Sequence, residues 1–156
     1  MASELAVGAP APDFDLAADG GRRVKLADFK GRTLVLYFYP KDDTSGCTTE
    51  AKAFAAASAD FMKAGAAIVG VSKDSVKSHD RFKAKYELNF ALGSDADGSV
   101  MERYGVWVEK SMYGRKYMGT ERATLVIDGQ GRIAKIWRKV KVPGHASQVL
   151  EAVRSL

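Results

Sequence analysis

The sequence predicts an α/β fold in which a mixed central β-sheet is flanked by helices. Segments with strand patterns alternate with segments of helical periodicity over most of the chain. One of these segments is a continuous apolar run, which is typical of a strand covered on both faces. Two strands around a glycine-containing turn, followed by a last helix, then close the chain.

The first half of the chain supplies a hairpin, a buried strand and a long helix. Two short strands, 13–16 and 23–26, flank a turn at 19–21 and are expected to form an N-terminal β-hairpin. Residues 34–39 form the apolar run and are expected to be the central strand. A helix should begin at about residue 45 and end near residue 63, because its apolar residues keep the 3.6-residue spacing of one buried face.

The second half continues the alternation of strands and helices. Ser72 to Ser75 offer cap residues for the next helix. The expected elements are strand 66–71, a helix ending near 86, strand 90–92, helix 99–104, strands 124–127 and 133–137 as an antiparallel hairpin, and helix 146–155.

Length and composition limit the classes of protein to consider. The 156 residues are expected to form a single domain, 1–156. The net charge of +5 is spread along the chain rather than gathered in a patch, so we expect no nucleic-acid partner. No apolar run approaches about 18 residues and residues 1–5 lack the pattern of a secretory signal, so we expect neither a membrane span nor secretion. A single cysteine fits a reducing, cytoplasmic location.

The only cysteine, Cys47, has the surroundings of a reactive thiol. A lone cysteine is often a small buried hydrophobe, but Gly46, Thr48 and Thr49 beside it carry no large apolar side chain. The thiolate is the nucleophilic form, and a free thiol has a pKa of about 8.5. A helix N-terminus stabilises an anion by about 0.3–1 kcal/mol, or up to ~2 when partly buried. Lowering a pKa by two units needs roughly 2.7 kcal/mol, so a buried cation or further donors should contribute.

The segment around Cys47 resembles the active-site segment of a peroxiredoxin. It runs Tyr-Phe-Tyr-Pro-Lys-Asp-Asp-Thr-Ser-Gly-Cys-Thr-Thr-Glu-Ala, in which Pro40, Thr44 and Cys47 match the family's P-x-x-x-T-x-x-C pattern. Stretches 8–14 and 107–127 extend the resemblance over nearly the whole chain, and it is to the peroxiredoxin Q group, also called bacterioferritin comigratory protein. The resemblance implies a thioredoxin-like fold and a thiol-dependent peroxidase that reduces hydrogen peroxide and organic hydroperoxides.

The resemblance also implies a role for five residues. Cys47 would attack the peroxide and become a sulfenic acid. The hydroxyl of Thr44 would hydrogen-bond the thiolate and the peroxide, although Thr44 is also a natural helix N-cap. Pro40 would shield the thiolate as well as end the strand. Arg122 would stabilise the anion and bind the peroxide, the alternative being a surface arginine. Glu50 would orient Thr44 or Arg122, or simply place a favourable charge at the helix start.

The absence of a second cysteine implies a one-cysteine enzyme. In two-cysteine relatives the resolving cysteine lies five residues after the peroxidatic one or on the following helix; here those positions hold Lys52 and, on the helix, Phe82, Lys83 and Ala84. An external thiol would therefore reduce the sulfenic acid, with thioredoxin or glutaredoxin and glutathione as the expected partners. No metal, haem or flavin cofactor is implied, and relatives of this group suggest a monomer.

Three points stay open from the sequence. A redox sensor or binding module with this fold, oxidised stoichiometrically, is the alternative function. The two histidines, His79 and His145, receive neither a catalytic nor a metal-binding role, because a metal site needs several ligands in register. Met112, Tyr113, Tyr117 and Met118 form either an apolar rim that receives organic hydroperoxides or a partner protein, or else a covered loop.

Overall fold

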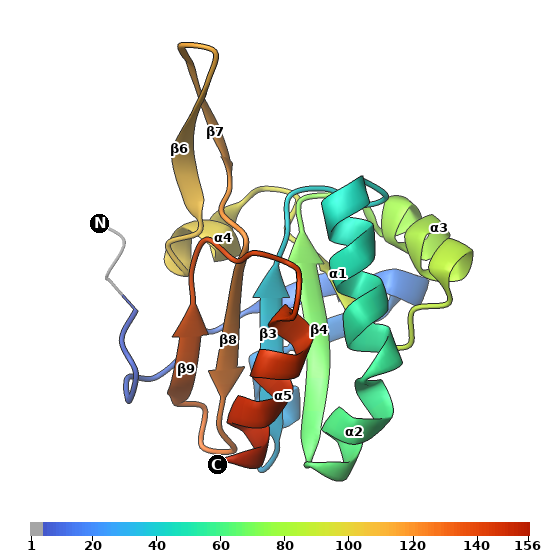
Figure 1. Cartoon of the computed structure of the whole chain (residues 1–156), viewed down its shortest axis with the longest axis vertical. Coiled ribbons are helices and arrows are strands. Elements are labelled where there is room, and N and C mark those ends of the chain that lie inside the picture. The colour runs from blue at the N-terminus through green and yellow to red at the C-terminus, as the bar shows by residue number, and fades with distance from the viewer. Residues whose placement is uncertain (1–4) are drawn as a thin grey trace.

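The computed structural model describes residues 5–156 as a seven-stranded sheet with helices packed on it and a separate two-stranded hairpin that projects from one end (Figure 1). Residues 1–4, the start of the segment in which we expect no secretory signal, lie outside the described residues. The strands of the main sheet, in the spatial order β2-β1-β5-β4-β3-β8-β9, are β1 Asp15–Ala18, β2 Arg23–Lys25, β3 Thr33–Phe38, β4 Ala66–Ser72, β5 Ala91–Ser94, β8 Ala123–Ile127 and β9 Ile133–Trp137.

The helices follow the strands as the alternation predicts. Ser75 caps the third α-helix by accepting a hydrogen bond from the backbone N–H of Ser78 at 3.1 Å, so the expected cap is confirmed. The α-helices are α1 Ser45–Ala56, α2 Ser58–Lys63, α3 Val76–Tyr86, α4 Ser99–Arg103 and α5 His145–Arg154, and the 3-10 turns are η1 Asp19–Gly21 and η2 Leu26–Phe29.

Strand β3 is an interior strand of the sheet, between β4 and β8, and its two faces point into two different cores. It runs parallel to β4 and antiparallel to β8, so the sheet is mixed as expected. Because successive side chains of a strand point to opposite faces, Leu36 and Phe38 enter one core while Val35 and Tyr37 enter the other. Helices α1, α2, α3 and α5 contribute to the second core, and α4 contributes to the first.

Three local expectations differ from the structure. The helix expected over 45–63 is broken at Ala57, whose ψ of 0° interrupts the helix between α1 and α2. The strand expected at 13–16 begins two residues later, at Asp15, and the strand expected at 90–92 is β5, 91–94. These are shifts within correctly assigned elements, and the N-terminal hairpin is confirmed by the antiparallel pairing of β1 with β2.

The projecting hairpin is an element that the sequence did not predict. Strands β6 Trp107–Met112 and β7 Arg115–Thr120 pair only with each other and extend beyond the main sheet (Figure 1). The side chain of Tyr113 at its tip is 99% exposed, and Met112, Tyr117 and Met118 are also exposed. The covered-loop interpretation of these four residues is therefore wrong. Within residues 5–156, no helix is long and apolar enough to cross a membrane.

Candidate active site

The cysteine lies in the first turn of α1, directly after the loop that leaves the central strand. Strand β3 ends at Phe38, the exposed Pro40 follows, and α1 begins at Ser45. Cys47 is only 2% exposed, and its thiol is free. The backbone N–H groups of a first turn have no partners within the helix, so this position stabilises a negative charge on sulfur.

Thr44 occupies the N-cap position, but its side chain does not cap the helix. Its backbone carbonyl accepts a hydrogen bond from the N–H of Thr48 at 2.8 Å, as the start of a helix requires. Its hydroxyl instead donates to the carbonyl oxygen of Lys41 at 2.8 Å, within the preceding loop. The capping interpretation therefore holds for the backbone of Thr44 and is wrong for its side chain.

Sheet pairing brings Arg122 to the cysteine. Ala123, the first residue of β8, lies opposite Phe38, the last residue of β3, so Arg122 stands where the loop 39–44 between β3 and α1 begins. Its Nη2 donates to Sγ of Cys47 at 3.3 Å. Its side chain is only 17% exposed, so the interpretation of Arg122 as a surface arginine is wrong. The missing cation anticipated for the thiolate is thus present in the structure.

A glycine makes room for this contact. A Cβ atom at Gly46 would lie 3.3 Å from Nη2 of Arg122, closer than most Cβ contacts in folded proteins. The backbone of Arg122 is held from the other side, since its carbonyl accepts a hydrogen bond from the N–H of Val140 at 3.0 Å. The guanidinium is therefore fixed in place by its surroundings.

Glu50 binds the second arm of the same guanidinium. Nη1 of Arg122 donates to Oε1 of Glu50 at 2.6 Å, so of the two partners expected for Glu50 the structure shows Arg122 and not Thr44. Glu50 is the sixth residue of α1, beyond its first turn, so the alternative of a charge at the helix start is wrong. Burial raises the pKa of Glu50 to about 7, and the facing guanidinium opposes that rise.

Several buried polar atoms around the cysteine keep unused hydrogen-bonding capacity. Among residues 5–156, the Tyr37 hydroxyl, the Thr48 hydroxyl and Oε2 of Glu50 have no hydrogen-bond partner. Burial, together with the negative charges of Glu50 and Cys47, raises the pKa of Tyr37 well above its ordinary value, so its hydroxyl stays protonated. The site therefore holds both donors and acceptors that no protein group occupies.

His145 is a neighbour of the site that the sequence did not reveal. It is buried at the start of α5, with Nε2 2.8 Å from the hydroxyl of Thr124. Burial and the charge of Arg122 lower the pKa of His145 to about 4, so the ring is neutral at pH 7. No local pattern could indicate this placement, because it depends on how α5 packs on β8.

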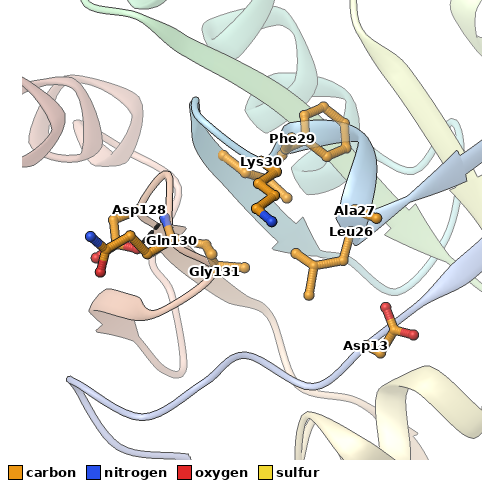
Figure 2. A pocket seen from close by; sticks show the side chains of 10 residues that line it. Asp13, Leu26, Ala27, Phe29, Lys30, Asp128, Gln130 and Gly131 are labelled. Atoms are coloured by element: carbon orange, nitrogen blue, oxygen red, sulfur yellow. Dashed lines mark hydrogen bonds between the residues drawn. The ribbon is translucent and has the colours of Figure 1, made fainter.

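One pocket of the described surface is separate from this site. It has a volume of about 240 Å³ and is lined by residues that include Leu26, Phe29 and Gly131 (Figure 2). Leu34 and Ile127 also line it, and they pair at the end of β3 and β8 remote from Phe38. The part of the chain that the structure describes has no cluster of three or more His, Cys, Asp or Glu side chains suited to a metal ion.

A buried thiol at a helix start, hydrogen-bonded by the arginine that precedes β8, is the setting of a reactive cysteine. The model of the AhpC/TSA family matches residues 7–136, and the chain belongs to this family. Its relatives are named peroxiredoxin Bcp, which confirms the resemblance to the peroxiredoxin Q group and the thiol-dependent peroxidase activity that it implies.

Individual relatives match over almost their full length. Peroxiredoxin Bcp of Bacillus subtilis is 45% identical, covering 97% of both chains, and peroxiredoxin Bcp of Xanthomonas campestris is 49% identical, covering 94% of this chain and 92% of its own. The solved structure of Xanthomonas campestris peroxiredoxin Q superposes with a TM-score of 0.90 at 47% identity, covering 97% of this chain and 96% of the other. The thioredoxin-like fold is therefore confirmed.

Proposed function

We propose that Cys47 is the peroxidatic residue and that its contact with Arg122 carries the activity. The thiolate attacks the terminal oxygen of a hydroperoxide, the O–O bond breaks, an S–O bond forms, and the departing alkoxide or hydroxide takes up a proton. The single observation that supports this assignment is the 3.3 Å hydrogen bond from the guanidinium to Sγ, inside a site where the thiol is almost fully buried. A charge-assisted bond of this kind is worth about twice a neutral one.

The peroxide is contacted by Arg122 and Thr44, whereas Pro40 acts only on the surroundings of the sulfur. The negative charge moves from sulfur to the departing oxygen, and a donor already fixed beside Sγ stabilises that charge without reorganisation. Thr44 supplies a hydroxyl at the entrance of the site, where its present bond to the Lys41 carbonyl orients it. Pro40 shields the thiolate from water, and as a proline it has no backbone N–H.

Glu50 acts as a positioning residue through Arg122. Its carboxylate occupies one arm of the guanidinium and leaves the other arm for Cys47. A planar guanidinium can serve both partners at once, which a lysine ammonium would do without fixed geometry. Glu50 itself has no hydrogen bond to Cys47 among the described residues, so its effect on the reaction is indirect.

Regeneration requires thiols from outside the chain, since Cys47 is the only cysteine. A first thiol attacks the sulfenic sulfur, forms a mixed disulfide and releases water; a second thiol attacks that disulfide and restores the Cys47 thiol. Thioredoxin, or glutaredoxin with glutathione, is the proposed source of these thiols. We propose hydrogen peroxide and organic hydroperoxides as substrates, and the alkyl peroxide reduction activity of the Xanthomonas campestris bacterioferritin comigratory protein supports the organic class.

We propose a cytoplasmic protein that acts as a monomer, in which residues 1–156 form one domain. A single free cysteine suits a reducing compartment. Sedimentation of the purified protein at micromolar concentration measures its mass, and a dimer would contradict the monomer.

The decisive experiment is the catalytic consumption of hydrogen peroxide. The protein is supplied in separate reactions with thioredoxin and its reductase, or with glutathione and glutaredoxin. Many equivalents of peroxide should be consumed with at least one system, which would also identify the electron donor. Consumption of no more than one equivalent with both systems would contradict catalysis and favour a redox sensor.

A further inference from the structure

A second buried polar cluster joins α3 to the loop 39–44 between β3 and α1, called the catalytic loop below. It has no part in the chemistry described above. Its centre is Asp42, two residues after Pro40. The Asp42 carboxylate accepts three hydrogen bonds: from the Tyr39 hydroxyl at 2.5 Å, from the Ser78 hydroxyl at 2.8 Å and from Nδ1 of His79 at 2.7 Å. The side chains of Asp42 and His79 are 4% and 0% exposed.

Both ring nitrogens of His79 have a polar partner. Nδ1 lies 2.7 Å from Oδ2 of Asp42, and Nε2 lies 3.0 Å from the carbonyl oxygen of Gly93. The Tyr39 hydroxyl also faces Nδ1, at 3.5 Å. Asp42 and His79 therefore form a buried, hydrogen-bonded pair whose side-chain polar atoms all have partners, and such satisfied networks hold their surroundings rigid.

The cluster attaches the catalytic loop to α3. Besides the bonds to Ser78 and His79, the next loop residue, Asp43, accepts hydrogen bonds from Lys85 and from the Tyr86 hydroxyl. Asp43 has a φ of +59°, a conformation that non-glycine residues seldom adopt without support from their surroundings. Two successive loop residues are thus held by one helix face.

The backbone of the loop is held as firmly as its side chains. The N–H of Asp42 donates to Oδ2 of Asp74 at 2.9 Å, just before α3. The residue before it, Lys41, provides the carbonyl that orients the Thr44 hydroxyl. Any loosening at Asp42 is therefore passed directly to the group proposed to contact the peroxide.

We propose that the buried His79–Asp42 pair is a positioning device for peroxide reduction, which holds the loop so that Thr44 is aimed at the reacting peroxide, while Arg122 and the first turn of α1 stabilise the thiolate. This inference rests on the proposed roles of Cys47 and Thr44. It separates two functions within the site: α3 controls how the peroxide is received, and β8 controls how reactive the sulfur is.

Two reagents distinguish these functions. Hydrogen peroxide requires the aligned loop, whereas iodoacetamide requires only an accessible thiolate. In Asp42→Asn and His79→Gln we expect the second-order rate of Cys47 oxidation by hydrogen peroxide to fall about tenfold or more, in line with the cost of small misalignments. The rate of alkylation by iodoacetamide should change less than about threefold. Arg81→Gln, on the exposed side of α3, is the matched control and should change neither rate.

Other outcomes would overturn the inference. Equal losses with both reagents would mean that the pair acts on the thiolate, and unchanged rates would mean that it has no role. Faster alkylation together with a lower melting temperature would mean that the pair only prevents unfolding of the buried thiol. If the substitutions of Asp42 and His79 prevent folding, Ser78→Ala is the alternative, because it removes one of the groups bonded to the Asp42 carboxyl. It should also slow oxidation by hydrogen peroxide selectively, but by a smaller factor.

Oxidation of Cys47 is followed in a single turnover without any reductant. A failure of this inference is therefore distinguishable from a failure of the peroxidase cycle, which would show as an absence of turnover in the parent protein.

Discussion

Two buried pairs of polar side chains flank the segment from Pro40 to Cys47, and they differ in how completely their hydrogen bonds are satisfied. Arg122 and Glu50 lie among side-chain atoms that have no partner within residues 5–156, including Oε2 of Glu50 itself. Asp42 and His79 lie in a closed network in which both carboxylate oxygens and both ring nitrogens have partners. The Asp42–His79 pair is almost fully buried, whereas the side chain of Arg122 is 17% exposed.

This difference follows from what each pair has to do. A site that stabilises a transition state needs donors that gain strength as charge develops, and a donor fully used in the resting protein has little left to give. A network that fixes a loop needs the reverse, since satisfied buried networks rigidify their surroundings and partly satisfied ones are costly. The unpartnered polar atoms around Cys47 are thus consistent with a reaction site. The complete hydrogen bonding of Asp42 is consistent with a structural support for the loop.

Replacement of Cys47, the proposed nucleophile, should have the largest effect on peroxide turnover. Cys47→Ser should abolish peroxide turnover, because a serine hydroxyl is far less acidic than a thiol and does not form a sulfenic acid. The measurement is steady-state consumption of hydrogen peroxide with the thiol system that supports the parent. Residual turnover comparable to that of the parent would contradict the central role of Cys47.

Removal of the cation should have the next largest effect. Arg122→Ala is expected to slow oxidation of Cys47 by hydrogen peroxide by roughly 10²–10³-fold, the usual cost of losing one fixed donor at a developing charge. Alkylation by iodoacetamide at pH 7 should slow as well, because less thiolate is present. Arg122→Lys keeps the charge but not the two-armed geometry and should recover only part of the rate. An unchanged alkylation rate in Arg122→Ala would disprove the assigned role.

Two tyrosines at the end of β3, Tyr37 and Tyr39, have ring centroids only 5.5 Å apart and allow a direct comparison of the two sets of polar groups. Tyr39→Phe removes a donor from Asp42 and should lower the free energy of unfolding by about 1–3 kcal/mol. Tyr37→Phe removes a hydroxyl that has no partner in residues 5–156 and should change stability by less than about 0.5 kcal/mol, or increase it. Urea unfolding of both variants measures the difference, and equal losses would show that the two clusters are not distinct.

The pH dependence of stability gives a finer test. The pKa of Glu50 is raised to about 7 from an ordinary 4.5, so the stability tied to its protonated form is complete below pH 4.5 and is lost as the pH rises through 7. Glu50→Gln should therefore lose less stability than the parent between pH 5 and pH 8. His145, whose low pKa acts in the opposite direction, is common to both proteins and cancels in the comparison.

Urea unfolding of the parent and of Glu50→Gln at the two pH values measures this change. Glu151→Gln, an exposed carboxylate on α5, is the control and should follow the parent. Parallel pH profiles for the parent and Glu50→Gln would contradict the raised pKa.

The sequence predicts most of the fold because its signals are local. The apolar run that becomes β3 and the cap at Ser75 each act within a few residues, and the structure confirms both. The break at Ala57 gives no signal, since alanine favours a continuous helix and the break depends on packing. The hairpin β6–β7 is missed because it is exposed on most of its length and lacks the alternation that marks a half-buried strand.

The residues of the site also fall into those that the local sequence indicates and those that only the tertiary fold brings together. Cys47 is indicated by its own neighbours, whereas the contact between Arg122 and Cys47 spans 75 residues and was expected only through the family resemblance. His79 received no role because a lone histidine on a helix gives no information on its partners. Its partner Asp42 lies 37 residues earlier, on a loop that only the tertiary fold brings to α3.

The pairing of β3 with β8 also has a consequence for the chain during its synthesis. Arg122 reaches Cys47 only when β8 joins β3, late in the order in which the chain is made. Until then Cys47 lacks this cation and reacts as an ordinary cysteine, mostly in its slow thiol form at neutral pH. On the proposed role of Arg122, rapid oxidation of Cys47 by peroxide therefore requires the finished fold.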